Sequence, residues 1–156
     1  MGVKMIAANR RARFDYEVRE TFEAGLVLYG SEVKSLRNHG ASIAESFAQV
    51  KAGEAWVMGM HIAPYSFARG GGHDPLRPRK LLLHRREIER ISSRVAERGL
   101  TLVPLRLYFK KDKAKLEVAL AKGRTKVDKR QVIREREQRR EMERGLRQVG
   151  RRLGGF

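Results

Sequence analysis

Two alternating apolar runs joined by a short polar turn constrain the fold of this chain more than any other feature. They form the segment 100–123, LTLVPLRLYFKKDKAKLEVALAKG. The apolar residues that share one parity on each run are Val103, Leu105, Leu107 and Phe109, followed by Leu116, Val118 and Leu120. This alternation predicts two antiparallel strands, each with one buried and one polar face. Because Pro104 cannot donate a ladder hydrogen bond, we expect a bulge or an unpaired position beside it.

Other β-rich segments precede this hairpin. The segment 46–62, SFAQVKAGEAWVMGMHI, indicates a second hairpin whose turn lies at residues 52–54. Residues 14–18 and 26–29 are predicted as short strands on either side of a bend at residues 23–25. The first 121 residues are therefore expected to be rich in antiparallel strands.

Two helices are predicted among these strands. Ser31 is the expected N-cap of a short helix over residues 31–40, and Gly40 suits the left-handed conformation at its end. The segment 85–98, RREIERISSRVAER, places an apolar stripe on one helical face and is followed by Gly99 as a stop.

The order of these elements predicts the fold class. Strands and helices do not alternate regularly, so a doubly wound parallel sheet is not expected. A mainly β domain fits better: a small closed antiparallel β-barrel resembling an oligonucleotide-binding (OB) fold, with about three short helices. The segment 69–80, RGGGHDPLRPRK, reads as a loop, and its cations leave open whether it is a plain connection or an RNA contact.

The charge of the chain indicates the class of its partner. The formal net charge is +17 at pH 7, which is most easily accommodated against a polyanion. Nucleic acid is the first candidate, and an anionic membrane surface is the second. The absence of cysteine excludes disulfides and thiolate metal sites, and no apolar run approaches the roughly 20 residues of a membrane span. We therefore expect a cytoplasmic protein.

The positive charge divides the chain into a body, residues 1–121, and a basic tail, residues 122–156. The tail carries 13 of the 35 Lys and Arg residues but only 5 of the 18 Asp and Glu residues. Residues 131–153 are rich in helix formers and have a narrow apolar stripe, interrupted by Gly145 and Gly150. Because an isolated helix of this kind is marginal, we expect a tail that is disordered until it binds an anionic surface. A solvated helix that packs its stripe on the body remains the alternative. A membrane-surface helix would need bulky aromatics on that stripe.

Catalytic and metal-binding patterns do not assemble in the sequence. The four histidines are scattered and none has HxxxH or HExxH spacing. No GxSxG motif and no phosphate-binding GxxxxGK[ST] loop occurs. The sequence predicts no enzyme activity, no cofactor, no metal site and no small-molecule substrate.

Several long blocks together resemble a known family. IAANRRARFDY, EAGLVLYGSEVKSLR, HIAPY, DPLRPRKLLLHRREI, LYFKKDKAKLEVALAKG and DKR occur in an order similar to the SsrA-binding protein family, small protein B. The resemblance covers essentially the whole body and reaches into the tail. It implies a barrel that binds the tRNA-like domain of transfer-messenger RNA (tmRNA) and brings it to stalled ribosomes. It further implies a monomer off the ribosome, whose tail becomes helical in the empty message channel of the small subunit.

The resemblance also implies which residues bind each partner. The expected tmRNA-binding residues are Asn9, Arg10, Arg11, Glu23, Arg79, Lys80, Leu82 and His84, where His84 stands at a position that is often Asn in the family. The expected residues at the decoding centre and in the message channel are Asp128, Lys129, Arg130, Arg134, Arg136, Arg139 and Arg140. The residue before the DKR signature is Val127, where the family commonly has His or Tyr. Two rivals stay open: a structural ribosomal protein that never cycles, or an RNA-processing enzyme.

Overall fold

The computed structural model describes residues 2–64 and 72–153, and the chain divides into two compact units, Met1–Gly123 and Arg124–Phe156. From here on, the body means the unit Met1–Gly123, which is two residues longer than the segment 1–121 defined from the charge. The first three residues of the predicted loop 69–80 fall within residues 65–71, which lie outside the described residues, and its last two residues belong to a strand. The helices and strands of the body are β1 (Val3–Ala8), α1 (Ala12–Asp15), β2 (Tyr16–Leu26), α2 (Gly30–Asn38), β3 (Ala41–Ser42), β4 (Phe47–Lys51), β5 (Glu54–Met58), β6 (His61–Ile62), β7 (Arg79–Leu82), α3 (Arg85–Arg98), β8 (Thr101–Lys110) and β9 (Lys113–Gly123). The second unit contains α4 (Lys126–Leu153), which we call the tail helix.

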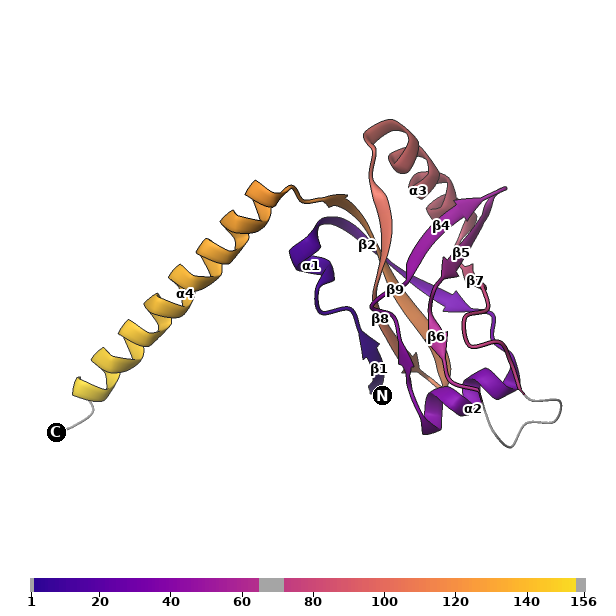
Figure 1. The fold of residues 1–156 in the computed structure, drawn as a ribbon, viewed down its shortest axis with the longest axis horizontal. Helices are drawn as coiled ribbons and strands as arrows, with labels where there is room; N and C mark the ends of the chain where they lie inside the picture. Colours follow the sequence, from indigo (N-terminus) through magenta and orange to yellow (C-terminus); the bar gives the residue numbers. More distant parts are fainter. Residues whose placement is uncertain (1, 65–71, 154–156) are drawn as a thin grey trace. The chain divides into compact units, whose positions relative to one another are not determined.

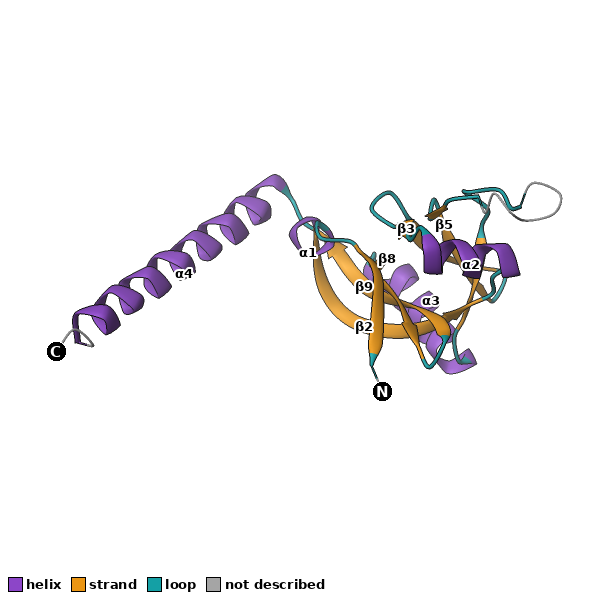
Figure 2. Ribbon diagram, turned by 90° about the horizontal axis from the view of Figure 1, so that it is seen from below, coloured by secondary structure: helices purple, strands orange, loops and turns teal. Residues whose placement is uncertain are grey.

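The body is built on an antiparallel sheet, which confirms the mainly β prediction. Its seven strands follow the order β1-β8-β4-β5-β7-β2-β9, and β8 pairs in addition with β9. The pairings therefore return to β8 after passing through β4, β5, β7, β2 and β9. Strands β3 and β6 form a separate two-stranded sheet. In Figure 1, α2 and α3 lie at opposite ends of the large sheet, and Figure 2 shows the long strands β2 and β9 curving.

Both predicted hairpins are present, and both close through two-residue turns. Ala52 and Gly53 connect β4 to β5, and Lys111 and Asp112 connect β8 to β9, all four with positive φ. Two adjacent residues with positive φ are the geometry of the type I′ turn, whose twist matches that of the strands it joins.

The bulge expected beside Pro104 is present, and it changes which side chains share a face. The register of β8 against β9 shifts between Pro104 and Arg106. As a result, Val103 and Leu105 pack in a small second cluster with two alanines of β9, while Leu107 belongs to the main core. The expectation of one buried face along all of β8 was therefore wrong, because a bulge reverses the side-chain alternation after it.

Strand β2 corrects the prediction for the first part of the chain. Residues 16–26 form one continuous strand, so the bend expected at residues 23–25 is absent. Ala24 is fully buried and Gly25 pairs with Leu82, which explains why small residues stand there without making a turn. Strand β1 and the short helix α1 were not predicted.

The helix predictions hold better at the C-terminal ends than at the N-terminal ends. Gly40 and Gly99 have positive φ just beyond α2 and α3, as predicted, and α3 has the predicted bounds. Helix α2 starts at Gly30 instead of after Ser31, because Tyr29 is its N-cap and donates its backbone N–H to Glu32 Oε1 at 2.8 Å. The Oγ of Ser31 lies 3.0 Å from His73 Nδ1 instead of capping the helix.

Residues 131–153, expected to become helical on binding, lie within the helix α4, which starts five residues earlier, at Lys126. Among the described residues, no helix has a stretch that is both long enough and apolar enough to cross a membrane.

Candidate nucleic-acid interface

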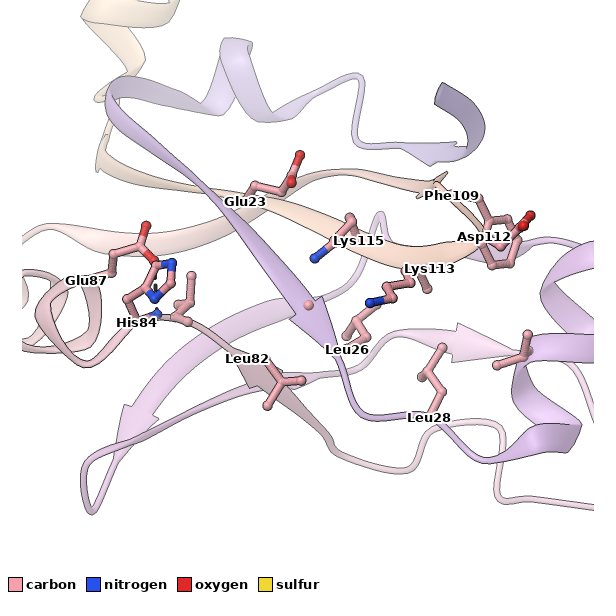
Figure 3. A pocket seen from close by; sticks show the side chains of 14 residues that line it. Glu23, Leu26, Leu28, Leu82, His84, Glu87, Phe109, Asp112, Lys113 and Lys115 are labelled. Atoms are coloured by element: carbon pink, nitrogen blue, oxygen red, sulfur yellow. Dashed lines mark hydrogen bonds between the residues drawn. The ribbon is translucent and has the colours of Figure 1, made fainter. Parts of the chain in front are cut away.

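Three predicted RNA-binding residues that are far apart in the sequence line one hollow of the body. Glu23 comes from β2, Leu82 from β7, and His84 from the residue before α3. We call this space of about 620 Å3 the β2–β7 hollow. Figure 3 shows it with Leu26 and Leu28 along its apolar side and with Lys113 and Lys115 of β9 nearby. The hollow thus offers an acceptor, an apolar surface and an imidazole within one concave site.

The carboxylate of Glu23 is held ready to accept hydrogen bonds. The hydroxyl of Tyr108 donates to Glu23 Oε2, and Lys110 Nζ lies 3.4 Å from both carboxylate oxygens. The hydrogen bond from Tyr108 is the main cause of a lowered pKa of Glu23. Because the side chain is still partly exposed, the ionised carboxylate has free lone pairs for the hydroxyl or amino groups of a nucleotide.

Leu82 supplies an apolar surface that faces outward. Its residue is 54% exposed although it lies in a strand, whereas its neighbour Leu81 is buried in the core. Gly25 lies opposite on β2, and a Cβ placed there would come 3.2 Å from Leu82 Cβ. The missing side chain of Gly25 therefore lets β2 and Leu82 approach closely.

His84 stands at the N-terminus of α3. Its backbone N–H donates to Glu87 Oε1 at 3.0 Å, which satisfies one of the free donors at the helix start. The His84 residue is exposed, so its ring is accessible from the β2–β7 hollow.

The structure places Asn9, Arg10 and Arg11 in a different hollow from Glu23. This second space, of about 700 Å3, lies between the β1–α1 connection and the start of β4. The Asn9 side chain donates from Nδ2 to the carbonyl of Pro104 at 3.3 Å, and its backbone N–H donates to Leu105 O at 2.8 Å. Asn9 therefore holds the chain against β8 at the bulge.

Phe47 lies in the same second hollow and is 53% exposed. Sequence reasoning missed it, because a lone aromatic at the start of a strand has no distinguishing pattern. An exposed ring in a hollow that Arg10 and Arg11 also line is a surface on which a base can stack.

A row of paired residues joins the two hollows across the sheet. Ala8 of β1 is in register with Arg106 of β8, Arg106 with Glu117 of β9, and Glu117 with Glu23 of β2. Arg106 and Glu117 form an ion pair in this row. Three strand spacings amount to about 14 Å, a distance that a short stretch of RNA spans easily.

Arg79 does not have the predicted position for a phosphate contact. Its side chain is fully buried, and its Nε donates to Glu32 Oε2 at 2.6 Å. The two terminal nitrogens donate to the backbone carbonyls of Met60, Pro75 and Asp74. With every nitrogen engaged inside the protein, Arg79 has a structural role in place of the predicted RNA contact.

Glu32 connects Arg79 to the surface. Its second oxygen accepts from Arg77 Nη2 at 2.5 Å, and the Arg77 guanidinium lies 3.9 Å from the Tyr29 ring centroid. Burial alone would raise the pKa of Glu32, but the hydrogen bonds from Arg77, the Tyr29 N–H and Arg79 outweigh it and lower that pKa. This buried network joins α2 to β7.

Lys80, the neighbour of Arg79, is on the outer side of β7. Its Nζ lies 3.3 Å from Glu54 Oε1, and both side chains are substantially exposed. An exposed pair of this kind contributes little to stability, so Lys80 can exchange its partner for a phosphate.

The tail helix presents its arginines to solvent. Arg130, Arg134, Arg136, Arg139 and Arg140 are all exposed, and Lys129 is partly buried. Of the predicted apolar stripe, Met142 is 69% and Leu146 71% exposed. The side chains of Val127 and Asp128 lie outside the described residues, as do those of residues 147–153.

Comparisons with known proteins bear on the family of the chain. The model of the SmpB protein family matches residues 6–148. The SsrA-binding protein of Thermobifida fusca is 56% identical over 146 residues, which cover 94% of this chain and 91% of the relative. That of Nocardioides sp. is 53% identical over 155 residues, covering 99% and 96%. A solved chain described as "tmRNA-SmpB: a journey to the center of the bacterial ribosome" is 44% identical, with a TM-score of 0.63 over 81% of this chain and 93% of that chain. The chain therefore belongs to the SmpB protein family.

Proposed function

We propose that this chain is an RNA-binding adaptor that binds tmRNA and delivers it to stalled ribosomes for trans-translation in the cytoplasm. The observation that carries the proposal is the β2–β7 hollow, in which Glu23, Leu82 and His84 converge from three separate parts of the chain. The family of the chain supports the same partner, since its relatives are SsrA-binding proteins.

The body acts in this proposal as the tmRNA-binding unit. The circuit of strand pairings supports a closed barrel of the OB type as its scaffold. Unpaired loop bases of the tRNA-like domain meet Glu23, Leu82 and His84, and proteins read such splayed bases by hydrogen bonds and apolar contact. Arg10, Arg11 and Lys80 neutralise phosphates, and no chemical step is needed.

The tail helix acts as the ribosome-binding unit. Asp128, Lys129 and Arg130 bind at the decoding centre, and the four following arginines Arg134, Arg136, Arg139 and Arg140 contact phosphates along the message channel. The apolar stripe and Gly145 make the isolated helix marginal, so the segment becomes fully helical on binding. An intact message would occupy the same channel, and specificity for stalled ribosomes is then steric.

Isolating the protein from its own cells and sequencing the co-purified RNA tests the partner. tmRNA is expected to be enriched far above its cellular share. Ribosomal RNA in constant proportion to the protein, without enrichment of tmRNA, would support a permanent ribosomal protein instead. Turnover of any RNA by the pure protein would support a processing enzyme.

Removing residues 124–156 separates the two units. The truncated protein is expected to bind the tRNA-like domain with nearly unchanged affinity. It should no longer support the tagging of stalled peptides. Equal loss of both activities would contradict a separate tail function. Circular dichroism of the peptide 124–156 should show little helix in buffer and more helix with small ribosomal subunits.

A further inference from the structure

A third hollow of the body is lined mainly by cations and lies apart from the two described above. It has a volume of about 420 Å3 between α3 and the paired strands β2 and β9. We call it the α3 groove. The cations that line it are Arg19, Arg90, Arg94, Arg98 and Lys122. Glu20 is the one carboxylate of its lining, and Leu100 and Leu120 form an apolar floor.

Three of these arginines form a row along one helix. Arg90, Arg94 and Arg98 follow one another at intervals of four residues, so they lie on one side of α3. Like charges at this spacing destabilise a helix by a few tenths of a kcal/mol per pair. The successive side chains are about 6 Å apart along the axis, which suits the repeat of phosphates along a nucleic-acid strand. An anion bound in the groove would relieve this repulsion between the arginines, and the relief would contribute to the free energy of binding.

The opposite wall is shaped by a β-bulge. The register of β2 against β9 shifts between Val18 and Glu20, so Arg19 is the extra residue. Neighbouring side chains of a regular strand point to opposite faces, yet Arg19 and Glu20 both line the groove. A bulge permits this because it re-aims the side chain. Lys122 of β9, in register with Glu17, completes the wall.

The carboxylate in the groove positions one arginine and leaves the others available. Glu20 Oε2 accepts from Arg90 Nε at 2.9 Å, which ties α3 to β2. Among the described side chains, Arg19 forms an ion pair only with the exposed Glu17, at 3.4 Å. Within the side chains that the structure describes, Arg94, Arg98 and Lys122 have no carboxylate partner. The groove is therefore built with uncompensated positive charge.

We propose that the α3 groove binds the phosphodiester backbone of an RNA strand, as a third contact beside the two hollows. The guanidinium forks of Arg94 and Arg98 hold successive phosphates, Lys122 and Arg19 hold the opposite side, and the leucine floor lies under the ribose. The proposal rests on the RNA-binding function given above. The strand belongs either to tmRNA or to the small ribosomal subunit, and both offer the same phosphate chemistry.

Binding measured with the full chain tests the groove and distinguishes the two sources. The variant Arg94→Gln/Arg98→Gln removes two groove charges and keeps the Arg90–Glu20 pair that holds α3. The matched control, Lys51→Gln/Lys111→Gln, removes the same charge from two exposed hairpin positions outside all three hollows. Each protein is titrated with the tRNA-like domain and, separately, with purified small subunits, over a series of KCl concentrations.

The groove variant should bind one of the two RNAs about tenfold more weakly at physiological salt. The magnitude of its slope of log K against log salt should decrease by about 2, one for each lost phosphate contact, with little change in the control. Loss toward the tRNA-like domain assigns the strand to tmRNA, and loss toward the subunit assigns it to ribosomal RNA. Lys122→Gln should lower the same slope by about 1 from the other wall.

Two results would overturn the proposed RNA site in the groove. The first is unchanged binding of both RNAs by the groove variant. The second is an equal loss of binding in the groove variant and the control, because such a loss would reflect the overall positive charge and not a site. Either result would leave the proposed function intact as long as the wild-type protein binds both partners. A wild-type protein that binds neither would reject the function itself. Matching thermal unfolding of all variants confirms that the comparison is between folded proteins.

Discussion

The helices α3 and α4 are both rich in arginine and both have a narrow apolar stripe, yet among the described side chains a fully buried residue is found only in the stripe of α3, where Val95 is still 41% exposed. In α3, Ile91 is fully buried in the core of the body and Gly99 closes the helix with a positive φ. In the tail helix, Met142 and Leu146 are among the most exposed large apolar residues of the described chain. Similar sequences thus give a fully buried apolar residue in α3 and two exposed ones in α4.

The difference shows where each helix obtains its stability. Most of the stability of helices in proteins comes from tertiary packing and not from intrinsic propensity. Helix α3 obtains it from the core and from the Arg90–Glu20 ion pair. In the tail helix the described residues Met142 and Leu146 are exposed, so we expect a partner to decide how much of this helix is formed. A helix can respond to a partner by folding only if it is marginally stable on its own. Helix α3 is held by the core of the body and could not respond in this way.

The largest effect is expected in the buried network of the body, which has no counterpart in the tail helix. Glu32→Gln would leave the Arg79 guanidinium buried without its counter-charge, and breaking such a pair costs about 3–5 kcal/mol. Urea unfolding of the body measures the loss. Glu141→Gln in the exposed part of α4 is the control and should change the unfolding free energy by less than about 0.5 kcal/mol. Similar values for both variants would mean that the Glu32 network does not hold the body together.

The same carboxylate predicts how the body responds to acid. The pKa of Glu32 is lowered in the folded protein from its ordinary value of 4.5, because the hydrogen bonds that it accepts outweigh its burial. Its contribution to stability is therefore fully present above pH 4.5 and is lost as the pH falls through the lower folded pKa. Unfolding free energy measured between pH 7 and pH 3 should fall in acid. The fall should be shallower in Glu32→Gln, and identical profiles would contradict this role. The pKa of Glu23 is also lowered, so Glu23 contributes to the loss of stability in acid in the same direction. Both the wild-type protein and Glu32→Gln contain it.

The next effect compares the two apolar stripes directly. Ile91→Ala should destabilise the body by about 2–5 kcal/mol, because it removes a fully buried side chain and leaves a cavity. Leu146→Ala should leave body unfolding unchanged and weaken only binding to small subunits. Thermal unfolding and subunit binding are measured on both variants. If Leu146→Ala lowered the body melting temperature as well, the stripe would be packed on the body, as the alternative interpretation of the tail holds.

The fold was predictable where the pattern was local. Both hairpins, the bounds of α3 and the two glycine stops follow from alternation, helical spacing and left-handed positions, which are properties of neighbouring residues. The continuous strand β2 was not predictable, because residues 23–25 resemble a turn. Only pairing with β7 and β9 shows why small residues are needed there. Strand β1 escaped prediction for the same reason, since its partner β8 lies a hundred residues away.

The candidate site was likewise predictable from the sequence only in part. The resemblance to a family indicated Glu23, Leu82 and His84, which line one hollow, but no pattern in the sequence shows that Asn9 lies in another. Arg79 was predicted as a phosphate ligand from the same resemblance, as part of the block RPRKLLL. Its burial depends on strand parity, since Arg79 and Leu81 point into the body while Lys80 and Leu82 point out. A strand recognised at residues 79–82 would have separated the two roles.

The smallest effect comes from the same substitution made in both regions. Gly145→Ala adds a Cβ that meets nothing within 4 Å, so it should favour the tail helix by up to about 1 kcal/mol. Gly25→Ala adds a Cβ 3.2 Å from Leu82, which must move by a few tenths of an ångström. We expect a destabilised body, by about 1 kcal/mol, and a few-fold weaker binding of the tRNA-like domain.

Hydrogen exchange of the α4 amides and subunit affinity measure the first variant, and urea unfolding with tmRNA binding measures the second. If the tail must fold to bind, Gly145→Ala slows exchange in α4 and tightens subunit binding, because part of the ordering is done in advance. Slower exchange without tighter binding would mean that the bound tail is not helical around Gly145. Faster exchange of the α4 amides in Gly145→Ala would contradict the premise that Gly145 keeps this helix marginally stable. The body variant should leave α4 exchange unchanged, since the two units obtain their stability from different sources.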